Sequence, residues 1–419
     1  MVMHFQHIGF ISTRIAGTDG VSLEIKKWAD VLERNGYSCY YFAGELDRRQ
    51  SRSFLVEKAH FKHPDIESLT KKCFGTTIRR RETANEIQKL KEYLKEKIYD
   101  FVEIFDIELI IPENALSIPL NIPLGLALTE FIAETGMPTI AHHHDFYWER
   151  DKFLVNAVND YLTLAFPPDL PSIKHVVINS LASKELSHRK GISNTIIPNV
   201  YDFANPPDDN VDCSKIFKKI GLKDNDLFIL QPTRILPRKQ IERAIEIVHY
   251  LRLKNPTLVI SHGVGYQEDE YKKKIERYAK KLGVKLAFIS KLVKVDASQT
   301  GDKFFTMADI YKCADLVTYP SSYEGFGNAF LEAIYYKKPI VVNRYSIYIT
   351  DIEPKGFDLV TINNMITEET IKKIKEVLKN KRRRTQIVNK NYELAKKYFS
   401  YEVLEELLIP LIRKLEKGW

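Results

Sequence analysis

The chain has 419 residues, of which 44% are hydrophobic and 28% are charged, with 18 glycines and 18 prolines. This is the composition of a globular protein of two or three domains, and it excludes a disordered chain, a collagen and a coiled-coil array. The formal net charge of +8 is too small to indicate nucleic-acid binding, but it suits an anionic ligand.

The cysteines and the apolar segments indicate the cellular compartment in which the protein is expected. The four cysteines lie far apart and have no metal-type spacing, so we expect unpaired, buried thiols in a reducing cytosol. The first residues show no signal-peptide pattern. The longest apolar stretch, residues 115–133, is interrupted by Pro119, Pro123 and Glu130, so it does not predict a membrane span. We therefore expect a soluble, cytoplasmic protein.

The first half of the chain alternates short β-branched or apolar runs with longer amphipathic ones. The pattern predicts strands at residues 7–12, 38–43, 101–111, 138–142, 174–178 and 195–197. It predicts helices at residues 21–35, 84–98 and 124–134. Such alternation is typical of βα units around a parallel sheet.

A segment without hydrophobic periodicity, residues 198–212, predicts a domain linker. The alternation then resumes, with strands predicted at 228–232, 257–261, 285–289, 316–319 and 339–343. Helices are predicted near 239–253, 268–282, 303–313 and 327–336. The pattern thus indicates two doubly wound sheets in tandem. Because ligands of such sheets bind beyond the carboxyl ends of the strands, the crevice between the sheets is the expected site.

The last part of the chain is helical in pattern, with helices predicted at 368–380, 382–397 and 402–417. Residues 379–384 carry five basic residues in six. This run indicates a solvated helix face or a helix junction, and contact with an anionic surface is the alternative.

A glycine-bearing turn at residues 13–22 follows the first predicted strand, and Asp19 and Gly20 stand where it meets the helix. Glycines at such a junction let backbone N–H groups approach a phosphate, and the helix N-terminus adds partial positive charge. The turn lacks the GxGxxG spacing of dinucleotide sites. A phosphate-binding turn and a purely structural one therefore both remain open.

Three consecutive histidines, His142, His143 and His144, stand at the carboxyl end of the strand predicted at 138–142. Strand alternation sends His142 and His144 to one face and His143 to the other. This arrangement is poor for a three-histidine metal site, and no metal site is predicted. His144, at the strand end, is suited to a hydrogen bond with a polyhydroxyl ligand.

Two cations, Arg234 and Lys239, stand where a strand of the second half passes into a helix. An arginine can make bidentate contacts with an anion and a lysine supplies a point charge, so this junction suits a diphosphate. A solvated loop is the alternative.

The most informative motif spans residues 319–333, where a strand leads into a glycine-bearing turn and a helix. Glu324 precedes the helix and Glu332 lies within it, about two turns further on. The first-turn N–H groups would face the polar groups of a ligand. An acidic residue in an otherwise apolar helix is costly to bury unless a ligand contacts it.

Residues 224–226 match the Asp-x-Asp pattern that holds a metal–diphosphate. They precede the strand predicted at 228–232, at the amino edge of the sheet, so we do not expect metal binding there.

These segments, in this order and with a linker that begins Ile197-Pro198-Asn199, resemble the GT4 family of retaining glycosyltransferases. The Glu-x7-Glu spacing of Glu324 and Glu332 is the most specific element, and the resemblance extends to about residue 351. It implies an α/β protein of GT-B architecture, with two Rossmann-like, doubly wound parallel-sheet domains facing a central cleft. The implied bounds are 1–205 for an acceptor domain, 206–395 for a donor domain and 396–419 for a helix that crosses back to the first domain.

The resemblance also implies residue roles for the donor. Glu332 would hold the nucleotide ribose and Glu324 the donor sugar, while Arg234 and Lys239 would bind the diphosphate. The first domain would contribute Asp19 and Gly20 near the diphosphate and His144 at the sugar. Backbone contacts would come from Phe326, Gly327, Asn328 and Ala329. The implied catalytic residues are His144, Arg234, Lys239 and Glu324.

The acceptor site is expected in the first domain. Glu113 and Asn114 follow a predicted strand there, and with His143, Tyr147 and Arg150 they predict a polar, partly cationic wall. We expect a small polar acceptor with a carboxylate or phosphate, such as a sugar or glyceric acid derivative. A lipid acceptor at the membrane surface is the alternative, although no basic amphipathic helix stands near this edge.

The expected activity is that of a hexosyltransferase, EC 2.4.1 type, which moves a hexose from a GDP-mannose-type or UDP-glucose-type donor to an acceptor hydroxyl with retention. No Ser–His–Asp or Cys–His arrangement is evident, which is consistent with front-face displacement assisted by the leaving diphosphate. We expect no metal or other cofactor and no nucleic-acid partner. The alternatives are a sugar-nucleotide epimerase or hydrolase on the same fold, and a non-catalytic nucleic-acid binder.

Overall fold

A computed structural model of the chain describes residues 4–418 except 18, 209–210, 224–225, 264–268 and 294–303. The chain divides into two compact units, the first formed by Met1–Val200 with Tyr401–Trp419 and the second by Tyr201–Ser400. The unit boundaries therefore lie at 200/201 and 400/401, whereas we placed domain boundaries at 205/206 and 395/396.

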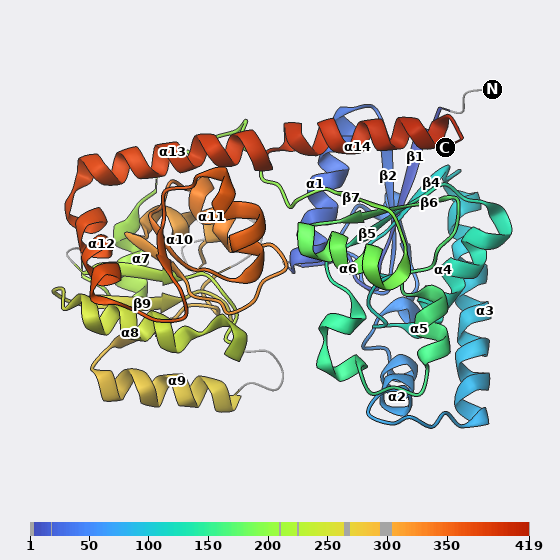
Figure 1. Cartoon of the computed structure of the whole chain (residues 1–419), viewed down its shortest axis with the longest axis horizontal. Helices are drawn as coiled ribbons and strands as arrows, with labels where there is room; N and C mark the ends of the chain where they lie inside the picture. Colours follow the sequence, from blue (N-terminus) through green and yellow to red (C-terminus); the bar gives the residue numbers. More distant parts are fainter. Residues whose placement is uncertain are drawn as a thin grey trace. The chain divides into compact units, whose positions relative to one another are not determined.

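The first unit is built on a parallel sheet, most of whose strands are labelled in Figure 1. The strand order is β3-β2-β1-β4-β5-β6-β7. Its strands are β1 (His7–Ile11), β2 (Ser38–Ala43), β3 (Ser53–Leu55), β4 (Leu109–Pro112), β5 (Thr139–His143), β6 (Ile173–Val177) and β7 (Asn194–Ile196). Its helices are α1 (Gly20–Arg34), α2 (Pro64–Cys73), α3 (Arg81–Ile104), α4 (Ile122–Thr135), α5 (Asn159–Ala165), α6 (Ser180–Lys190) and α14 (Tyr401–Glu416).

The second unit repeats this plan with the strand order β10-β9-β8-β11-β12-β13. Its strands are β8 (Leu227–Gln231), β9 (Pro256–Ile260), β10 (Lys285–Phe288), β11 (Leu316–Tyr319), β12 (Ile340–Asn343) and β13 (Val360–Ile362). Its helices are α7 (Cys213–Ile220), α8 (Ile241–Leu251), α9 (Asp269–Leu282), α10 (Met307–Cys313), α11 (Asn328–Tyr335), α12 (Glu368–Lys379) and α13 (Lys381–Phe399). Both orders are doubly wound, so the prediction of two parallel α/β sheets is confirmed.

Helices of the first unit begin and end at residues suited to those positions. The side chains of Asn121 and Asn179 accept hydrogen bonds from Leu124 N (3.0 Å) and Ala182 N (2.7 Å), which caps α4 and α6. Both helices end at a glycine in the left-handed region, Gly136 and Gly191. The strand-to-helix turns are thereby fixed by local sequence.

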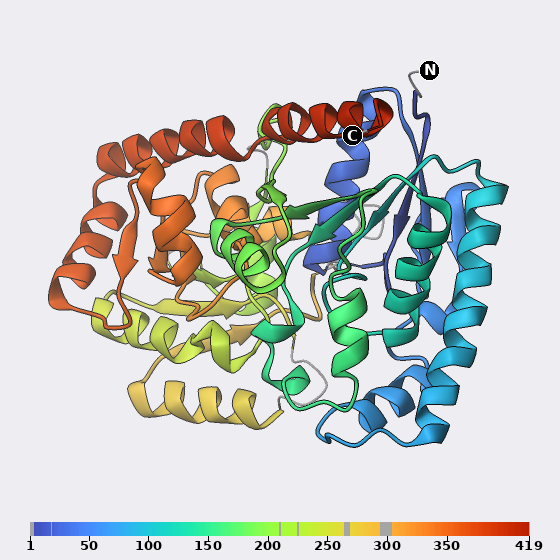
Figure 2. The ribbon, with the colours of Figure 1, turned by 45° about the vertical axis from the view of Figure 1, so that its right-hand side comes forward.

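The last two helices pack on different units (Figure 2). Helix α13 packs against α11 in the second unit, and α14 packs against α1 in the first. Leu404, Leu408 and Ile412 of α14 are fully buried members of the first unit's core. Glu416 near the end of α14 accepts a hydrogen bond from the N–H of Phe5 at 3.1 Å, which ties the two ends of the chain together.

The strand predicted at 101–111 is wrong in its first part. Residues 101–104 complete α3, and β4 begins only at Leu109. The buried side chains Leu90, Leu94, Ile98 and Phe101 recur every three or four residues, so the helical face continues through Phe101. None of the helices among the described residues has the length and apolarity that a membrane crossing requires.

The prediction of four unpaired thiols is wrong for one pair. Cys213 opens α7 and Cys313 ends α10, and the two are joined by a disulfide. Helices α7 and α10 pack together, and the two Cα atoms lie 5.6 Å apart, within the range that a disulfide spans. Cys39 and Cys73 are free and buried, as expected. We expected a reducing compartment because we expected all four thiols to be unpaired, and the disulfide removes this reason.

Candidate functional site

The second unit brings two loops together at the carboxyl ends of the neighbouring strands β8 and β11. Gln231, the last residue of β8, is fully buried and joins the loop after β8 to strand β11: its Nε2 donates to Thr233 Oγ1 (2.9 Å), and its Oε1 accepts from Thr318 Oγ1 of β11 (2.7 Å). The N–H of Ser322 also donates to the carbonyl of Arg238 at 2.9 Å. The loop after β8 and the loop after β11 are therefore held in fixed register.

A buried carboxylate between two cations is the centre of this site. Glu324 Oε2 accepts from Arg238 Nη1 at 2.9 Å, and Glu324 Oε1 pairs with Lys239 Nζ. Arg238 Nη1 also donates to the carbonyl of Tyr323 at 3.0 Å. Glu324 is 6% exposed and Lys239 is 7% exposed, so their charges are only weakly screened by water.

Burial and mutual attraction act in opposite directions on these charges. Burial lowers the pKa of Lys239 to about 8, against the attraction of Glu324. Burial raises the pKa of Glu324, but Lys239 and Arg238 outweigh it, and the net pKa lies below the ordinary value. At neutral pH the site therefore holds two cations and one anion, a net positive charge that suits an anionic ligand.

A tight turn connects Glu324 to the N-terminus of α11. Gly327 caps the helix with φ +121° and ψ 69°, in a region that residues with a side chain rarely adopt. A Cβ at this position would meet Tyr345 Oη at 2.8 Å. The same hydroxyl donates to the carbonyl of Phe326 at 2.7 Å. The backbone of Phe326 and Gly327 is thus held by a buried tyrosine, and the positive end of the α11 dipole follows it.

The remaining residues predicted in this unit lie on or beside α11 and the loop after β8. Glu332 is half-buried on α11, and its Oε2 accepts from Tyr311 Oη at 2.8 Å. Asn328 and Ala329 form the first turn of α11. Arg234 is exposed in the loop after β8. Burial, together with the positive charges of Arg234 and Lys239, lowers the pKa of His262 to about 4.

Two residues of this site were missed by sequence reasoning, Arg238 and His262. The signal for Arg238 is Pro237, which favours the short 3-10 turn Pro237–Lys239, and from this turn Arg238 and Lys239 both reach Glu324. His262 follows β9 by two residues, as a strand-end position of the same sheet. Its position could have been predicted from the strand order but not from a local motif.

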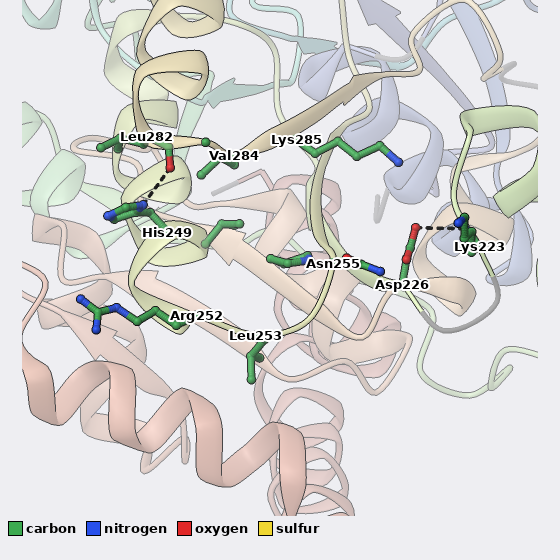
Figure 3. A pocket seen from close by; sticks show the side chains of 12 residues that line it. Lys223, Asp226, His249, Arg252, Leu253, Asn255, Leu282, Val284 and Lys285 are labelled. Carbon is green, nitrogen blue, oxygen red and sulfur yellow. Dashed lines mark hydrogen bonds between the residues drawn. The ribbon is translucent and has the colours of Figure 1, made fainter.

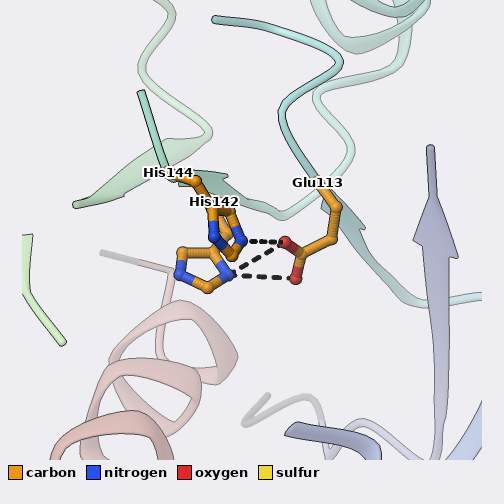
Figure 4. Close-up of side chains that lie close together, drawn as sticks. All are labelled: Glu113, His142 and His144. Atoms are coloured by element: carbon orange, nitrogen blue, oxygen red, sulfur yellow. Dashed lines mark hydrogen bonds and ion pairs between the residues drawn. The ribbon is translucent and has the colours of Figure 1, made fainter. Parts of the chain in front are cut away.

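The first unit holds a second polar cluster, formed by Glu113, His142 and His144 (Figure 4). Glu113 follows β4, and it pairs through an isolated bridge with His142 of the neighbouring strand β5. The carboxylate of Glu113 is fully buried and contacts His142 Nδ1 at 3.0 Å and His144 Nε2 at 3.1 Å. Two imidazoles and a carboxylate are a donor set that transition metals accept, but here the carboxylate forms hydrogen bonds with both rings.

The predicted alternation of the histidines is confirmed, and it removes His143 from the acceptor wall. His143 points to the other face, is fully buried and contacts His175 Nδ1 through its Nε2 at 2.9 Å. The assignment of His143 as an acceptor contact is therefore wrong. Glu113 is likewise too deeply buried to line a surface, whereas Asn114 is 9% exposed and accepts from the N–H of His144 at 2.8 Å.

Two other predicted acceptor residues stand beyond β5. Tyr147 is half-buried and packs against the cluster around Ile122 and Leu126. Arg150 is half-buried and pairs with Asp145, with an Nε–Oδ2 distance of 2.6 Å. Both side chains thus remain candidates for an acceptor surface.

The turn after β1 gives its two predicted residues different roles. Asp19 caps α1: its Oδ1 accepts from the N–H groups of Val21 and Ser22, both at 3.1 Å. Its carboxylate thus uses N–H groups of the helix N-terminus, and its assignment as a donor-binding residue stays a prediction. Gly20 is the exposed first residue of α1.

A cavity of about 540 Å³ lies elsewhere in the second unit, at the amino edge of its sheet (Figure 3). Its lining includes Lys223, Asp226, Arg252 and Lys285 but no residue predicted for the site. Asp226 Oδ2 accepts from the N–H of Lys223 at 3.0 Å. The other two residues of the Asp-x-Asp motif, 224 and 225, lie outside the described residues.

The sequence matches a family model and curated relatives. The model described as glycosyl transferases group 1 matches residues 212–394. The chain is 32% identical to a mannosylglucosylglycerate synthase of Thermotoga maritima, over 96% of this chain and 98% of the relative. It is 35% identical to a protein of the same name from Petrotoga mobilis, over 85% of this chain and 86% of the relative.

Solved structures show the same architecture. A sucrose-phosphate synthase of Thermosynechococcus elongatus matches with a TM-score of 0.68 at 14% identity. The match covers 99% of this chain and 100% of that one, so the likeness is one of fold.

Proposed function

The chain belongs to the glycosyl transferases group 1 family, and from this premise we propose that it transfers a mannosyl group from a nucleoside-diphosphate sugar to glucosylglycerate. The relatives confirm the predicted family, the GT-B fold and the glycosyltransferase class. The acceptor proposed here is a small polar molecule with a carboxylate. It follows from the name that both curated relatives carry.

The buried arrangement of Glu324 between Arg238 and Lys239 carries this proposal. In the proposed complex the two cations, with Arg234 from the same loop, bind the diphosphate, and the N-terminus of α11 adds its dipole. Glu324 then holds both cations in place and contacts the donor sugar. Glu332, on the same helix, binds the ribose, and the backbone from Phe326 to Ala329 contacts sugar and phosphate.

The first unit would supply the acceptor side. We assign Asn114, Tyr147 and Arg150 to the acceptor, because an arginine and an amide can bind a carboxylate and hydroxyl groups. Gly20, at the first position of α1, would approach the diphosphate, and His144 would contact the donor sugar.

We propose that transfer proceeds with retention by front-face displacement. The bond from the sugar C1 to the diphosphate oxygen breaks, and the acceptor oxygen bonds to C1 on the same face. The hydroxyl proton passes to the diphosphate oxygen that leaves. Lys239 and Arg238 stabilise the negative charge that develops on this oxygen, so the protein acts mainly by positioning and electrostatics. This step requires no metal ion.

The pH dependence of the proposed reaction should report on Lys239. kcat/KM reflects the free enzyme, so it is expected to fall as the pH rises through about 8, where Lys239 loses its charge. Lys239→Arg keeps its charge throughout this range and should move the alkaline limb to higher pH. A pH–rate profile of both forms checks this, and identical alkaline limbs would contradict it.

The proposed function is tested by incubating the protein, with and without EDTA, with GDP-mannose or UDP-glucose and glucosylglycerate. We expect mass spectrometry to show glucosylglycerate enlarged by one hexose with GDP-mannose and not with UDP-glucose, and NMR to show that the product keeps the anomeric configuration of the donor. EDTA should leave the rate unchanged. Donor consumption without acceptor would instead indicate a hydrolase or epimerase, and transfer only to lipid extracts would indicate a membrane acceptor.

A further inference from the structure

The side chains of Glu113, His142 and His144 form a hydrogen-bonded cluster. Both oxygens of the Glu113 carboxylate lie 3.0 Å from His142 Nδ1, and one of them lies 3.1 Å from His144 Nε2 (Figure 4). The backbone of Glu113 is also fixed, since its N–H donates to Ile11 O at 2.8 Å and its carbonyl accepts from Ser12 Oγ at 3.1 Å. One buried carboxylate therefore sets the orientation of two rings.

The hydrogen bonds also fix where each ring carries its proton. An ionised carboxylate only accepts, so His142 must carry a proton on Nδ1 and His144 a proton on Nε2. His142 Nε2 is buried and has no hydrogen-bond partner among the described residues. Burial lowers the pKa of His142, so this ring stays neutral. The His142 ring stacks on Trp28 of α1, with centroids 4.2 Å apart, which keeps it in place.

His144 differs from His142 in having one ring atom left for a ligand. Its side chain is 11% exposed, and within the described residues its Nδ1 has no hydrogen-bond partner. The His144 backbone N–H donates to Asn114 Oδ1, so both ends of this residue are anchored to the loop after β4. The arrangement thus presents a single ring nitrogen, Nδ1, to a ligand.

The charges around His144 come from three elements of the first unit. Glu113 faces His144 from the end of β4, and Glu24 faces it from α1. His142 lies on β5 itself, and Asp145 lies just after that strand. Glu24 is itself buried and bonded to Lys27 Nζ at 2.5 Å. Burial lowers the pKa of His144, but the bond to Glu113 and the acidic neighbours outweigh it and raise the pKa above its usual value.

We propose that Glu113 is a positioning residue that acts through His144: it orients the ring and holds its proton on Nε2, so that Nδ1 accepts a hydrogen bond from a hydroxyl of the donor sugar. This inference rests on the proposed function, in which His144 contacts that sugar. The active form of His144 is the neutral ring, because only then is Nδ1 an acceptor. Protonation of Nδ1 in acid replaces the acceptor by a donor and places a cation beside a sugar carbon that becomes positive during transfer.

The activity test is the acid limb of the pH–rate profile. In the wild type, kcat/KM should rise with pH as His144 loses its proton. Glu113→Gln removes the nearby negative charge, so the limb should move about one to two pH units lower, and the plateau should fall about tenfold as the ring orientation loosens. Glu113→Asp keeps the charge and should keep the limb. A variant with a merely structural defect would lower the plateau without moving the limb.

Two controls sharpen this test. Glu130→Gln removes a carboxylate of the same unit that pairs with Lys91 and Lys95, and it should leave the limb in place. The alkaline limb assigned to Lys239 should not move in Glu113→Gln. An unchanged acid limb in Glu113→Gln, with activity retained, would overturn the inference.

A second readout does not depend on the reaction. In 15N-histidine NMR titrations, the His144 resonance is identified as the one that is absent from His144→Gln. In the wild type this resonance should show a proton held on Nε2. Its pKa should be lower in Glu113→Gln than in the wild type. If the wild type transfers no sugar but this shift is found, the proposed function fails and the pairing stands. If the shift is absent, or if purified protein carries about one metal ion per chain that Glu113→Gln loses, the inference is wrong.

Discussion

Replacing Lys239 with methionine is expected to lower kcat of the proposed transfer about a hundredfold or more. Methionine keeps much of the length of the side chain and removes the charge that faces the developing negative charge on the diphosphate. Loss of one preorganised stabilising group in a dry site costs about 10²–10³ in rate. Because Arg238 still pairs with Glu324, the buried carboxylate keeps a partner and the unit should remain folded.

The matched control for this variant is Lys373→Met, which removes an exposed lysine of α12 in the same unit that pairs with Glu369. It should leave kcat and KM unchanged, because exposed pairs contribute little. Steady-state kinetics and circular dichroism on both variants measure the effect. A Lys239→Met variant that is folded and retains wild-type kcat would show that this cation takes no part in transfer.

Gly327→Ala is expected to weaken binding of the nucleotide sugar about tenfold or more. The added Cβ would lie 2.8 Å from Tyr345 Oη and 3.3 Å from two atoms of Tyr319, both buried rings. A positive φ at a residue with a side chain adds about 1–3 kcal/mol of strain. Relief of the clash must displace Tyr345 from the Phe326 carbonyl, and this moves the backbone that the donor would contact.

The control is Gly356→Ala, at a glycine of the same unit with φ +84° where an added Cβ would have no atom within 4 Å. It carries the backbone strain without the clash, so it should lower stability by about 1 kcal/mol and leave donor affinity unchanged. Tyr345→Phe alone removes the hydrogen bond to the Phe326 carbonyl without adding a Cβ, so it should also weaken donor binding. Isothermal titration with the donor separates these outcomes, and equal affinity in Gly327→Ala and the wild type would contradict the account.

The order of the longer elements could be predicted because most of them carry a clear hydrophobic period, whereas the helix α6 has almost none and was not predicted. The strand at 316–319 and the turn and helix that follow it lie where the motif placed them. The edge strands β3 and β13 were missed, since three residues are too few to show alternation, although the equally short edge strand β7 was predicted. The Cys213–Cys313 disulfide was missed because its partners are 100 residues apart and meet only through the packing of α7 on α10.

The site was predictable where one segment carried both the residue and its setting. Glu324 was placed before a helix N-terminus, and Lys239 at a strand–helix junction, and the structure pairs them. Arg238 was missed because only the fold brings it to Glu324 across two loops. The capping role of Asp19 could not be predicted, because a carboxylate that caps its own helix has the same local sequence as one that faces a ligand.

Arg238 and Lys239, held by Glu324, are proposed to bind the diphosphate of the donor, and the proposed function depends on this contact. Isothermal titration of GDP and UDP into the wild type and the Arg238→Met/Lys239→Met/Glu324→Gln triple variant tests it most directly, because the triple variant leaves no unpaired buried charge. We expect one molecule of the cognate nucleotide to bind per wild-type chain and the triple variant to bind it about a hundredfold or more weakly, with circular dichroism showing that the variant is folded. Undiminished binding to the folded triple variant would contradict the account.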